Sequence, residues 1–418
     1  MLNTLVNAWK VPDIRKKILF TLAMLIIFRL GSHIPVPGVN PAQIQKALGS
    51  GALFGFFDII SGGSFSNFTI FAMSIIPYIN ASIIMQLLTI AIPSLEQMAK
   101  EGEEGRKKIA QYTRYLTVVL ALIQSIGMTV GLRNALISRG FFDMAIVVIT
   151  LTAGTSFLMW LGERITENGI GNGSSLIIFA GIISRIPNMI STTVQYVQAG
   201  TSNIFGALAF VVAILVMVVS IILMSEGQRR ISVQYAKRVV GRKVYGGKST
   251  HIPIKINMAG VIPLIFSLSL LQFPQQIATF FPKTAFYDFV TRWLGTNGWI
   301  YNVLNALLIL FFTYFYTAII FNPIEISDNM KKYGGFIPGI RPGKPTTDYI
   351  TKVMNRITFV GGIFLAAVAI LPVILMNITG LQLYFGGTAL LIAVGVALDT
   401  MKQIEGQLVM RNYQGFLK

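Results

Sequence analysis

The chain has 418 residues, of which 54% are hydrophobic and only 12% are charged. A soluble domain carries about 25% charged residues, so this charge density excludes a water-soluble fold of this size. The apolar content excludes a disordered chain, and the absence of Cys excludes a disulfide-stapled scaffold. The composition therefore predicts a polytopic membrane protein. The formal net charge of +18 indicates either an anionic partner or the cytoplasmic side of a membrane protein.

Ten apolar stretches are long enough to be membrane-spanning helices, because a helix needs roughly 20 mostly apolar residues to cross the bilayer core. The runs are continuous rather than alternating, which favours helices over a barrel. In chain order they are Ile18–Ile34, Phe68–Ile92, Tyr115–Leu132, Met144–Leu161, Ser174–Ile190, Ile204–Met224, Asn257–Phe280, Tyr301–Phe321, Ile357–Met376 and Leu383–Leu398. The first run follows a basic stretch but lacks a small-x-small cleavage site, so we expect it to be a retained span.

The distribution of basic residues predicts the topology. Of the 34 Lys and Arg residues, 27 fall before the first span, in alternate loops or in the C-terminal tail. This distribution places both termini in the cytoplasm by the positive-inside rule. Ten spans divide into five and five at the long loop Ser225–Lys255, with residues 1–200 and 201–418 as the two halves. Two halves with an odd number of spans enter the membrane in opposite senses, which suggests inverted halves around a pathway.

No span carries a charged residue at its centre, and Arg29, Arg185, Asp143 and Asp399 are expected near span ends. Ion-coupled transporters normally place ionisable groups inside the membrane, so this pattern argues against one.

The chain also lacks the sequence signatures of enzymes. Gly247-Lys248-Ser249 resembles the end of a P-loop, but the required upstream glycine is replaced by Arg242. His33 and His251 are expected on opposite sides of the membrane and form no metal pair. The sequence therefore predicts no catalytic residue, no metal and no cofactor.

The segment Gly51–Asn67 is apolar, too short to span, and interrupted by Gly55, Gly62 and Gly63. Irregular backbone at membrane depth must be buried in protein or line a cavity. The segment is therefore either a hairpin at the membrane interface or a small movable stopper inside a pore.

Two cytoplasmic loops, about 225–256 and 323–356, are long and basic. Positive-inside bias explains their charge, but it does not explain their length, because a connection between adjacent helices needs only a few residues. A docking platform for RNA or an acidic protein face is the alternative. Arg341 lies between Gly339 and Gly343 in a turn that would present its guanidinium at the tip.

Seven segments resemble the SecY family of protein translocase channels. They are FRLGSHIPVPGV (Phe28–Val39), IIPYINASIIMQLL (Ile75–Leu88), EGRKKIAQYTRY (Glu104–Tyr115), MWLGERITENGIGNG (Met159–Gly173), Gln234–Pro263, Phe321–Gly343 and YFGGTALLI (Tyr384–Ile392). The resemblance covers essentially the whole chain, and Phe281–Trp299 is its least similar part. It implies an all-α fold of about ten transmembrane helices, in two pseudo-symmetric inverted halves around an hourglass pore in the bacterial cytoplasmic membrane.

The resemblance also implies site residues. By motif position, the apolar ring at the waist of the pore falls on Ile75, Ile79, Ile178, Ile265 and Ile392. The family's plug corresponds to residues 53–67, with Phe54, Phe57, Ile60, Gly62 and Gly63. The lateral gate lies between spans two and three and spans seven and eight, with Asn80, Gln86, Gln124 and Gln272 as polar candidates. Residues chosen for docking of the SecA motor or the ribosome are Arg238, Arg242, Lys243 and Arg341.

Each implied role has an ordinary alternative: Ile in a membrane helix usually meets lipid or another helix, and a buried amide often joins helices elsewhere. The family's companions are the small membrane subunits SecE and SecG, and its substrates are signal sequences and unfolded preproteins. A secondary transporter for a small solute is the second hypothesis, and an intramembrane enzyme is the third. A transporter would need a polar site at the membrane midplane, and an enzyme would need a catalytic pair at membrane depth.

Overall fold

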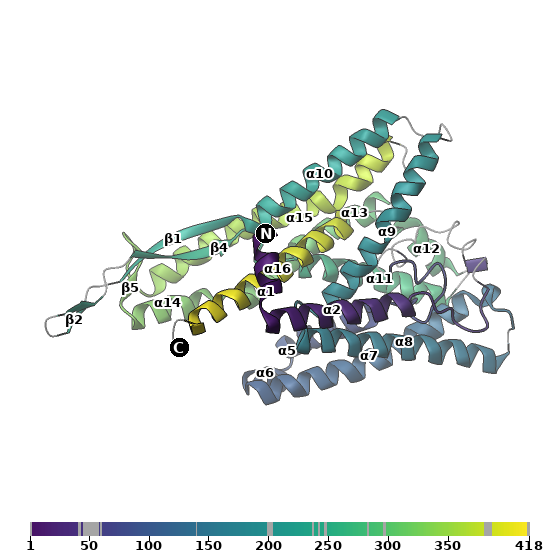
Figure 1. The fold of residues 1–418 in the computed structure, drawn as a ribbon, viewed down its shortest axis with the longest axis horizontal. Coiled ribbons are helices and arrows are strands. Elements are labelled where there is room, and N and C mark those ends of the chain that lie inside the picture. Colours follow the sequence, from purple (N-terminus) through teal and green to yellow (C-terminus); the bar gives the residue numbers. More distant parts are fainter. Residues whose placement is uncertain are drawn as a thin grey trace.

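In a computed structural model, the chain folds into a helical bundle with a small sheet at one end (Figure 1). The structure describes residues 2–40, 43–44, 58, 61–138, 140–198, 204–235, 238–240, 243–245, 249–281, 284–295, 298–379 and 387–415. Helices of the first half of the chain are α1 (Leu2–Lys10), α2 (Pro12–Gly31), α5 (Ile76–Ala91), α6 (Pro93–Lys100), α7 (Glu103–Gly131), η1 (Arg133–Ala135), α8 (Phe141–Asn168) and α9 (Gly173–Gln198). Helices of the second half are α10 (Ile204–Glu226), α11 (Ile262–Phe280), α12 (Ala285–Trp293), α13 (Trp299–Ile320), α14 (Pro323–Lys332), α15 (Lys344–Thr379) and α16 (Gly387–Gly415).

A helix lies at each of the ten positions predicted from the sequence. Among the described residues, seven helices are long and apolar enough to span a membrane, or up to eight if the bent pair α5–α6 counts as one. The chain turns by 100° between these two helices, where Pro93 disfavours helical backbone at Ile92. Helix α2 is outside this set because charges occupy its first turns, and the apolar part of α11, Ile262–Gln275, is short.

The predicted start of the second span at Phe68 is wrong. The helix begins at Ile76, with Pro77 in its first turn. Residues 61–75 instead form successive turns, with positive φ angles at Phe68 and Ser74. Residues other than glycine rarely adopt such angles, so apolar composition alone does not reveal this irregular backbone.

The two long basic loops fold together into one platform. Strand β1 (Gln228–Tyr235) pairs antiparallel with β4 (Ser249–Lys255) and with β5 (Gly335–Phe336), which comes from the second loop. Apolar residues alternate along β1, as expected for a strand with one buried face. They form a separate small core with α14 and the start of α15, which contains Ile231, Val233, Ile254, Met330, Ile337 and Ile350.

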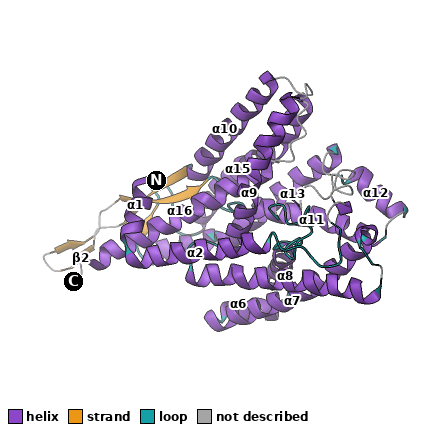
Figure 2. Ribbon diagram, turned by 45° about the vertical axis from the view of Figure 1, so that its right-hand side comes forward, coloured by secondary structure: helices purple, strands orange, loops and turns teal. Residues whose placement is uncertain are grey.

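The strands β2 (Arg238–Val240) and β3 (Lys243–Tyr245) form a second, two-stranded sheet. This sheet lies at the far tip of the platform (Figure 1). Ala8 of α1, Ile14 of α2 and Ile404 of α16 pack in one small cluster. The N-terminal label lies where the platform joins the bundle (Figure 1), and both chain ends lie beside the platform in Figure 2.

Candidate functional site

The five isoleucines predicted for the apolar ring come together in the largest apolar cluster of the described chain. Ile75 directly precedes α5 and Ile79 lies one turn into it, while Ile178, Ile265 and Ile392 come from α9, α11 and α16. Ile75, Ile178 and Ile392 are at most 2% exposed, and the other two are partly buried against the cluster. Helices from both halves of the chain therefore contribute to the cluster that contains these five side chains.

The segment that leads into Ile75 is buried inside the bundle. Phe65, Phe68 and Phe71 are at most 2% exposed, and Phe71 stacks between Phe28 of α2 and Phe157 of α8 with ring centroids 6.1 and 5.9 Å away. An interfacial hairpin would expose these rings, so that alternative does not fit residues 61–75. The predicted plug residues Phe54, Phe57 and Ile60 lie outside the described residues.

Charged side chains hold the first part of this segment. Arg185 of α9 forms an ion pair with Asp58 and donates a hydrogen bond to the Ser66 hydroxyl at 3.2 Å. Arg29 of α2 donates to the Gly62 carbonyl oxygen at 3.1 Å. The segment is thus bound from two helices by two guanidinium groups.

The expectation that Arg185 lies near a span end is wrong. Helix α9 continues past Pro187 to Gln198, which is eight residues beyond the predicted end at Ile190. Arg185 is therefore halfway along the helix, with its side chain 19% exposed. The sequence offered one overlooked signal, an acidic residue (Asp58) in the apolar segment that could pair with an arginine at membrane depth.

Both predicted plug glycines sit against α9. A Cβ atom on Gly62 would lie 2.8 Å from the Gly181 Cα atom, and its φ of +65° already disfavours other residues. A Cβ atom on Gly63, at φ +93°, would lie 3.3 Å from the guanidinium carbon of Arg185. Glycine is needed here because the backbone of the segment approaches α9 so closely.

Helices α5, α11 and α13 meet at an aromatic seam. Phe266 of α11 packs edge-on against Phe312 and Tyr316 of α13, with ring centroids 5.6 and 5.2 Å apart, and Ile83 of α5 joins the same cluster. Gly127 of α7 closes the other side, because a Cβ atom there would lie 2.3 Å from the Phe280 ring of α11. This seam is where the sequence places the lateral gate.

The four polar gate candidates have different environments. Gln86 of α5 accepts a hydrogen bond from the Tyr316 hydroxyl across the seam. Both amide atoms of Asn80 and the amide nitrogen of Gln124 are buried without a hydrogen-bond partner in the described structure. Gln272 of α11 is 4% exposed. Sequence reasoning missed Tyr316, because a tyrosine in an apolar helix gives no sign of the partner it will meet.

The docking candidates belong to the platform. Arg238 is on β2 and Lys243 on β3, at the tip, and Arg242 lies outside the described residues. Arg341 is exposed in the turn between Gly339 and Gly343, both of which have positive φ angles. Its carbonyl oxygen accepts a hydrogen bond from the Thr346 hydroxyl at 2.9 Å. The predicted presentation of this guanidinium at a tight turn is therefore confirmed for the backbone and for exposure.

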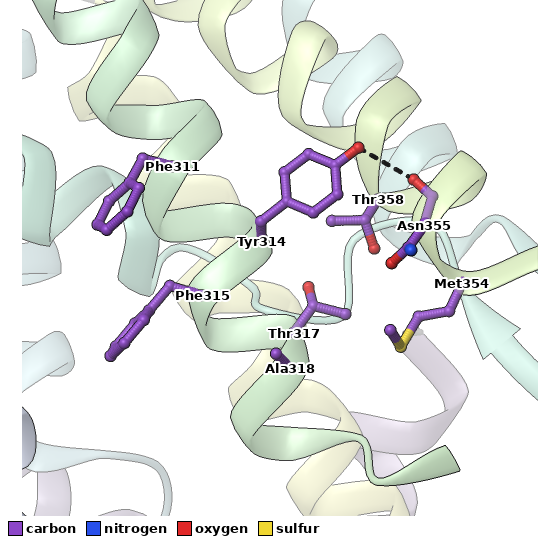
Figure 3. A pocket seen from close by; sticks show the side chains of 8 residues that line it. All are labelled: Phe311, Tyr314, Phe315, Thr317, Ala318, Met354, Asn355 and Thr358. Atoms are coloured by element: carbon purple, nitrogen blue, oxygen red, sulfur yellow. Dashed lines mark hydrogen bonds between the residues drawn. The ribbon is translucent and has the colours of Figure 1, made fainter. Parts of the chain in front are cut away.

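A cleft of about 320 Å³ lies between α13 and α15 (Figure 3). Its wall includes Phe311, Thr317 and Met354, and the Tyr314 hydroxyl donates to the Asn355 carbonyl oxygen at 3.2 Å. None of the predicted site residues lines it. Among the described residues, no group of three or more His, Asp or Glu side chains could bind a metal.

These features define a polytopic helical membrane protein whose interior is closed by apolar side chains and by a buried non-helical segment. Residues 69–401 match the SecY family. The chain is 50% identical to a "Protein translocase subunit SecY" from Halalkalibacterium halodurans, over 100% of both chains. It therefore belongs to the SecY family, which confirms the resemblance seen in the sequence, and it is a non-enzymatic translocase channel subunit.

Three solved structures share the fold. A structure described as a protein conducting channel has a TM-score of 0.69 and 19% identity. A SecY whose plug domain is described as stabilising the closed channel has a TM-score of 0.65 and 18% identity. Sec61 in a canine ribosome–channel complex has a TM-score of 0.66 and 18% identity. Each comparison covers 95% of both chains, so the predicted helical membrane-channel fold is confirmed.

Proposed function

We propose that this SecY-family channel subunit conducts unfolded secretory proteins through its helix bundle, between residues 1–200 and residues 201–418. The path passes the ring formed by Ile75, Ile79, Ile178, Ile265 and Ile392. Membrane segments leave sideways through the seam between α5/α7 and α11/α13. The buried segment, with Gly62 and Gly63, is the plug that closes the path at rest.

One observation carries this proposal: the chain leads from the plug segment through the interior to the ring. Residues 68–74 follow the plug segment, are packed in the interior, and lead into Ile75, itself a ring residue that is fully buried. The other ring residues come from four different helices, which can separate when the two halves move. A stopper and a constriction on one continuous piece of chain fit a gated pore better than a solute-binding site.

The chemistry of isoleucine suits this waist. A narrow apolar constriction dewets and so resists ions. Branched side chains are stiff at χ1, and they contact any passing side chain without offering a hydrogen bond. The ring can therefore seal against ions while it remains tolerant of polypeptide sequence.

The seam suits a lateral gate because its polar groups are poorly satisfied. Asn80 and Gln124 are buried without partners, while Gln86 bonds across to Tyr316. An unsatisfied buried amide costs about 1–3 kcal/mol, so the closed seam is less stable than its packing suggests. A signal sequence that enters the seam replaces these contacts with its own.

The platform serves as the docking surface for the SecA motor or for ribosomal RNA, through Arg238, Arg242, Lys243 and Arg341. Both chain ends lie beside the platform in Figure 2, which supports cytoplasmic termini in the cytoplasmic membrane. SecE and SecG are the expected companions in the bilayer. If RNA is the partner, Arg341→Gln should weaken ribosome binding and reduce its dependence on salt concentration.

The absence of cysteine gives a direct test. Single cysteines are placed at Ile79 or Ile178, and an exported chain with one cysteine is stalled halfway through the channel. Oxidation should form a disulfide at both positions. Ile26 and Leu215, each 60% exposed on the outside of the bundle, provide matched controls that should stay uncrosslinked.

Disulfides that form at Ile79 and Ile178 but not at the two control positions would place the substrate in the proposed path. Equal crosslinking at Ile26 and Leu215, or none at the ring despite confirmed stalling, would refute the path and favour the small-solute transporter.

A further inference from the structure

We propose that Asp58, Arg185 and Arg29 form a charge latch that holds the plug segment closed and must break before the channel opens. The inference rests on the proposed function, since it assumes that Asp58 and residues 61–66 move when the path opens. It makes the two arginines positioning residues, because they bind the plug segment.

The latch joins the segment to two helices through four contacts. Asp58 pairs with Arg185, Ser66 accepts a 3.2 Å hydrogen bond from Arg185, and Gly62 accepts through its carbonyl oxygen from Arg29 at 3.1 Å and from the Ser184 hydroxyl at 3.4 Å. Arg29 is on α2, whereas Arg185 and Ser184 are on α9. Every one of these contacts is broken if the segment moves away from the two helices.

Burial makes the ion pair important. The side chains of Asp58 and Arg185 are 16% and 19% exposed, so water screens their attraction only weakly. Removing one partner of a buried pair leaves an uncompensated charge and is strongly destabilising. If the segment leaves its site, Arg185 therefore remains on α9 without this partner for its charge.

The cluster contains two cations and one anion. While the segment is in place, the Asp58 carboxylate and the Gly62 carbonyl oxygen receive the two guanidinium groups. When the segment leaves, both guanidinium groups lose these acceptors at once. This imbalance favours return of the segment, which makes closure the default state of an idle channel.

A second reading is that Asp58 only shapes the turn that contains it. Its Oδ1 atom accepts the backbone N–H of Ser66 at 2.8 Å, and its carbonyl oxygen accepts the N–H of Gly63 at 2.9 Å. The substitution Asp58→Asn separates the two readings, because the amide oxygen still accepts from Ser66 while the negative charge is lost.

The test measures ion leak through idle channels. The full chain with its companion subunits is reconstituted in lipid bilayers, without substrate, as wild type, Asp58→Asn, Arg185→Gln and the double variant. We expect each single variant to raise the leak about tenfold. The double variant should leak no more than either single, because both substitutions break the same pair.

Charge reversal tests the ion pair itself, because exchanging the two charges should reduce the leak only if the two side chains attract each other. Asp58→Arg and Arg185→Asp should each leak, and their combination should leak less than either single variant, because it restores the ion pair although an arginine at position 58 cannot accept the Ser66 N–H. Asp288→Asn and Arg292→Gln change exposed residues on α12 and serve as matched controls without effect. Unchanged leak in Asp58→Asn and Arg185→Gln, additive leaks in the double variant, or no rescue by the reversed pair would each overturn the latch.

The stalled-substrate crosslink distinguishes failure of the latch from failure of the proposed function. If the latch is wrong, Asp58→Asn shows wild-type leak while the substrate still crosslinks at Ile79. If the path itself is wrong, the crosslink at Ile79 is absent in the wild type as well.

Discussion

In the function proposed above, the plug segment and the lateral seam close two exits of the same channel, and they differ in chemistry. The plug segment is held by two arginines, by glycine contacts against α9 and by buried phenylalanines. The seam is held by interlocking aromatic rings with one hydrogen bond across it, and it leaves the amides of Asn80 and Gln124 unpaired.

The difference shows how each exit can be opened. The contacts of the plug segment depend on particular charged and polar partners, so they are lost when the segment leaves them. Dispersion contacts between rings are short-ranged, but another apolar surface can replace them. A signal sequence is such a surface, whereas an apolar surface cannot pair with the charge of Arg185 once Asp58 has left it.

The largest effect is expected at the aromatic seam. Phe266→Ala removes a ring packed against Phe312 and Tyr316, and a truncation of this kind in a core costs about 3 kcal/mol. Exported proteins with defective signal sequences should then pass more readily, which a translocation assay measures. Phe359→Ala, 50% exposed on α15, is the matched control. Equal effects of the two truncations would show that the seam does not depend on this cluster.

The next effect is expected at the glycine contact of the plug segment. Gly62→Ala places a Cβ atom 2.8 Å from the Gly181 backbone at a φ of +65°, which costs about 1–3 kcal/mol in backbone strain plus the clash. Idle ion leak should rise. Gly38→Ala has a similar φ of +81° but nothing within 4 Å, so it reports the strain alone. If both variants leak equally, close approach to α9 is not what seats the segment.

Removing an unpaired amide from the seam should make the closed seam more stable, which is the opposite of the effect of Phe266→Ala. Asn80→Leu has nearly the same shape and no polar atoms, so it should stabilise the closed seam by about 1 kcal/mol. Insertion of membrane segments with weak signals should slow, while idle leak stays at the wild-type level. Faster insertion by Asn80→Leu would mean that the amide has a partner in the closed state.

The smallest effect is expected for the hydrogen bond across the seam. Tyr316→Phe removes only the hydroxyl that Gln86 accepts from, and such bonds between membrane helices average about 0.6 kcal/mol. A slight gain in passage of defective signal sequences is the expected result. Tyr314→Phe breaks a hydrogen bond to the Asn355 carbonyl oxygen away from the seam (Figure 3). This control variant should not change the passage of exported proteins with defective signal sequences. A large effect of Tyr316→Phe alone would make polar contacts, rather than ring packing, the main closure of the gate.

The sequence by itself determined the helices and the family. Long apolar runs must become helices in a membrane because every backbone polar group needs a partner within its own segment, so a helix was expected at each of the ten observed positions. The motifs then placed five isoleucines that the structure brings into one cluster. The tight turn at Arg341 was also predictable, because Gly339 and Gly343 supply the backbone angles it needs.

Only the tertiary structure decided how residues distant in the sequence meet. Residues 68–75, which their apolar composition alone suggested were helical, form turns that are buried against α2 and α8. The pairing of β1 with β5 joins two loops about 100 residues apart. Asp58 with Arg185, and Gln86 with Tyr316, are single polar contacts across more than 120 residues. The periodicity of a sequence shows which face of a helix or strand is apolar. It carries no information about which side chain of another element that face will contact.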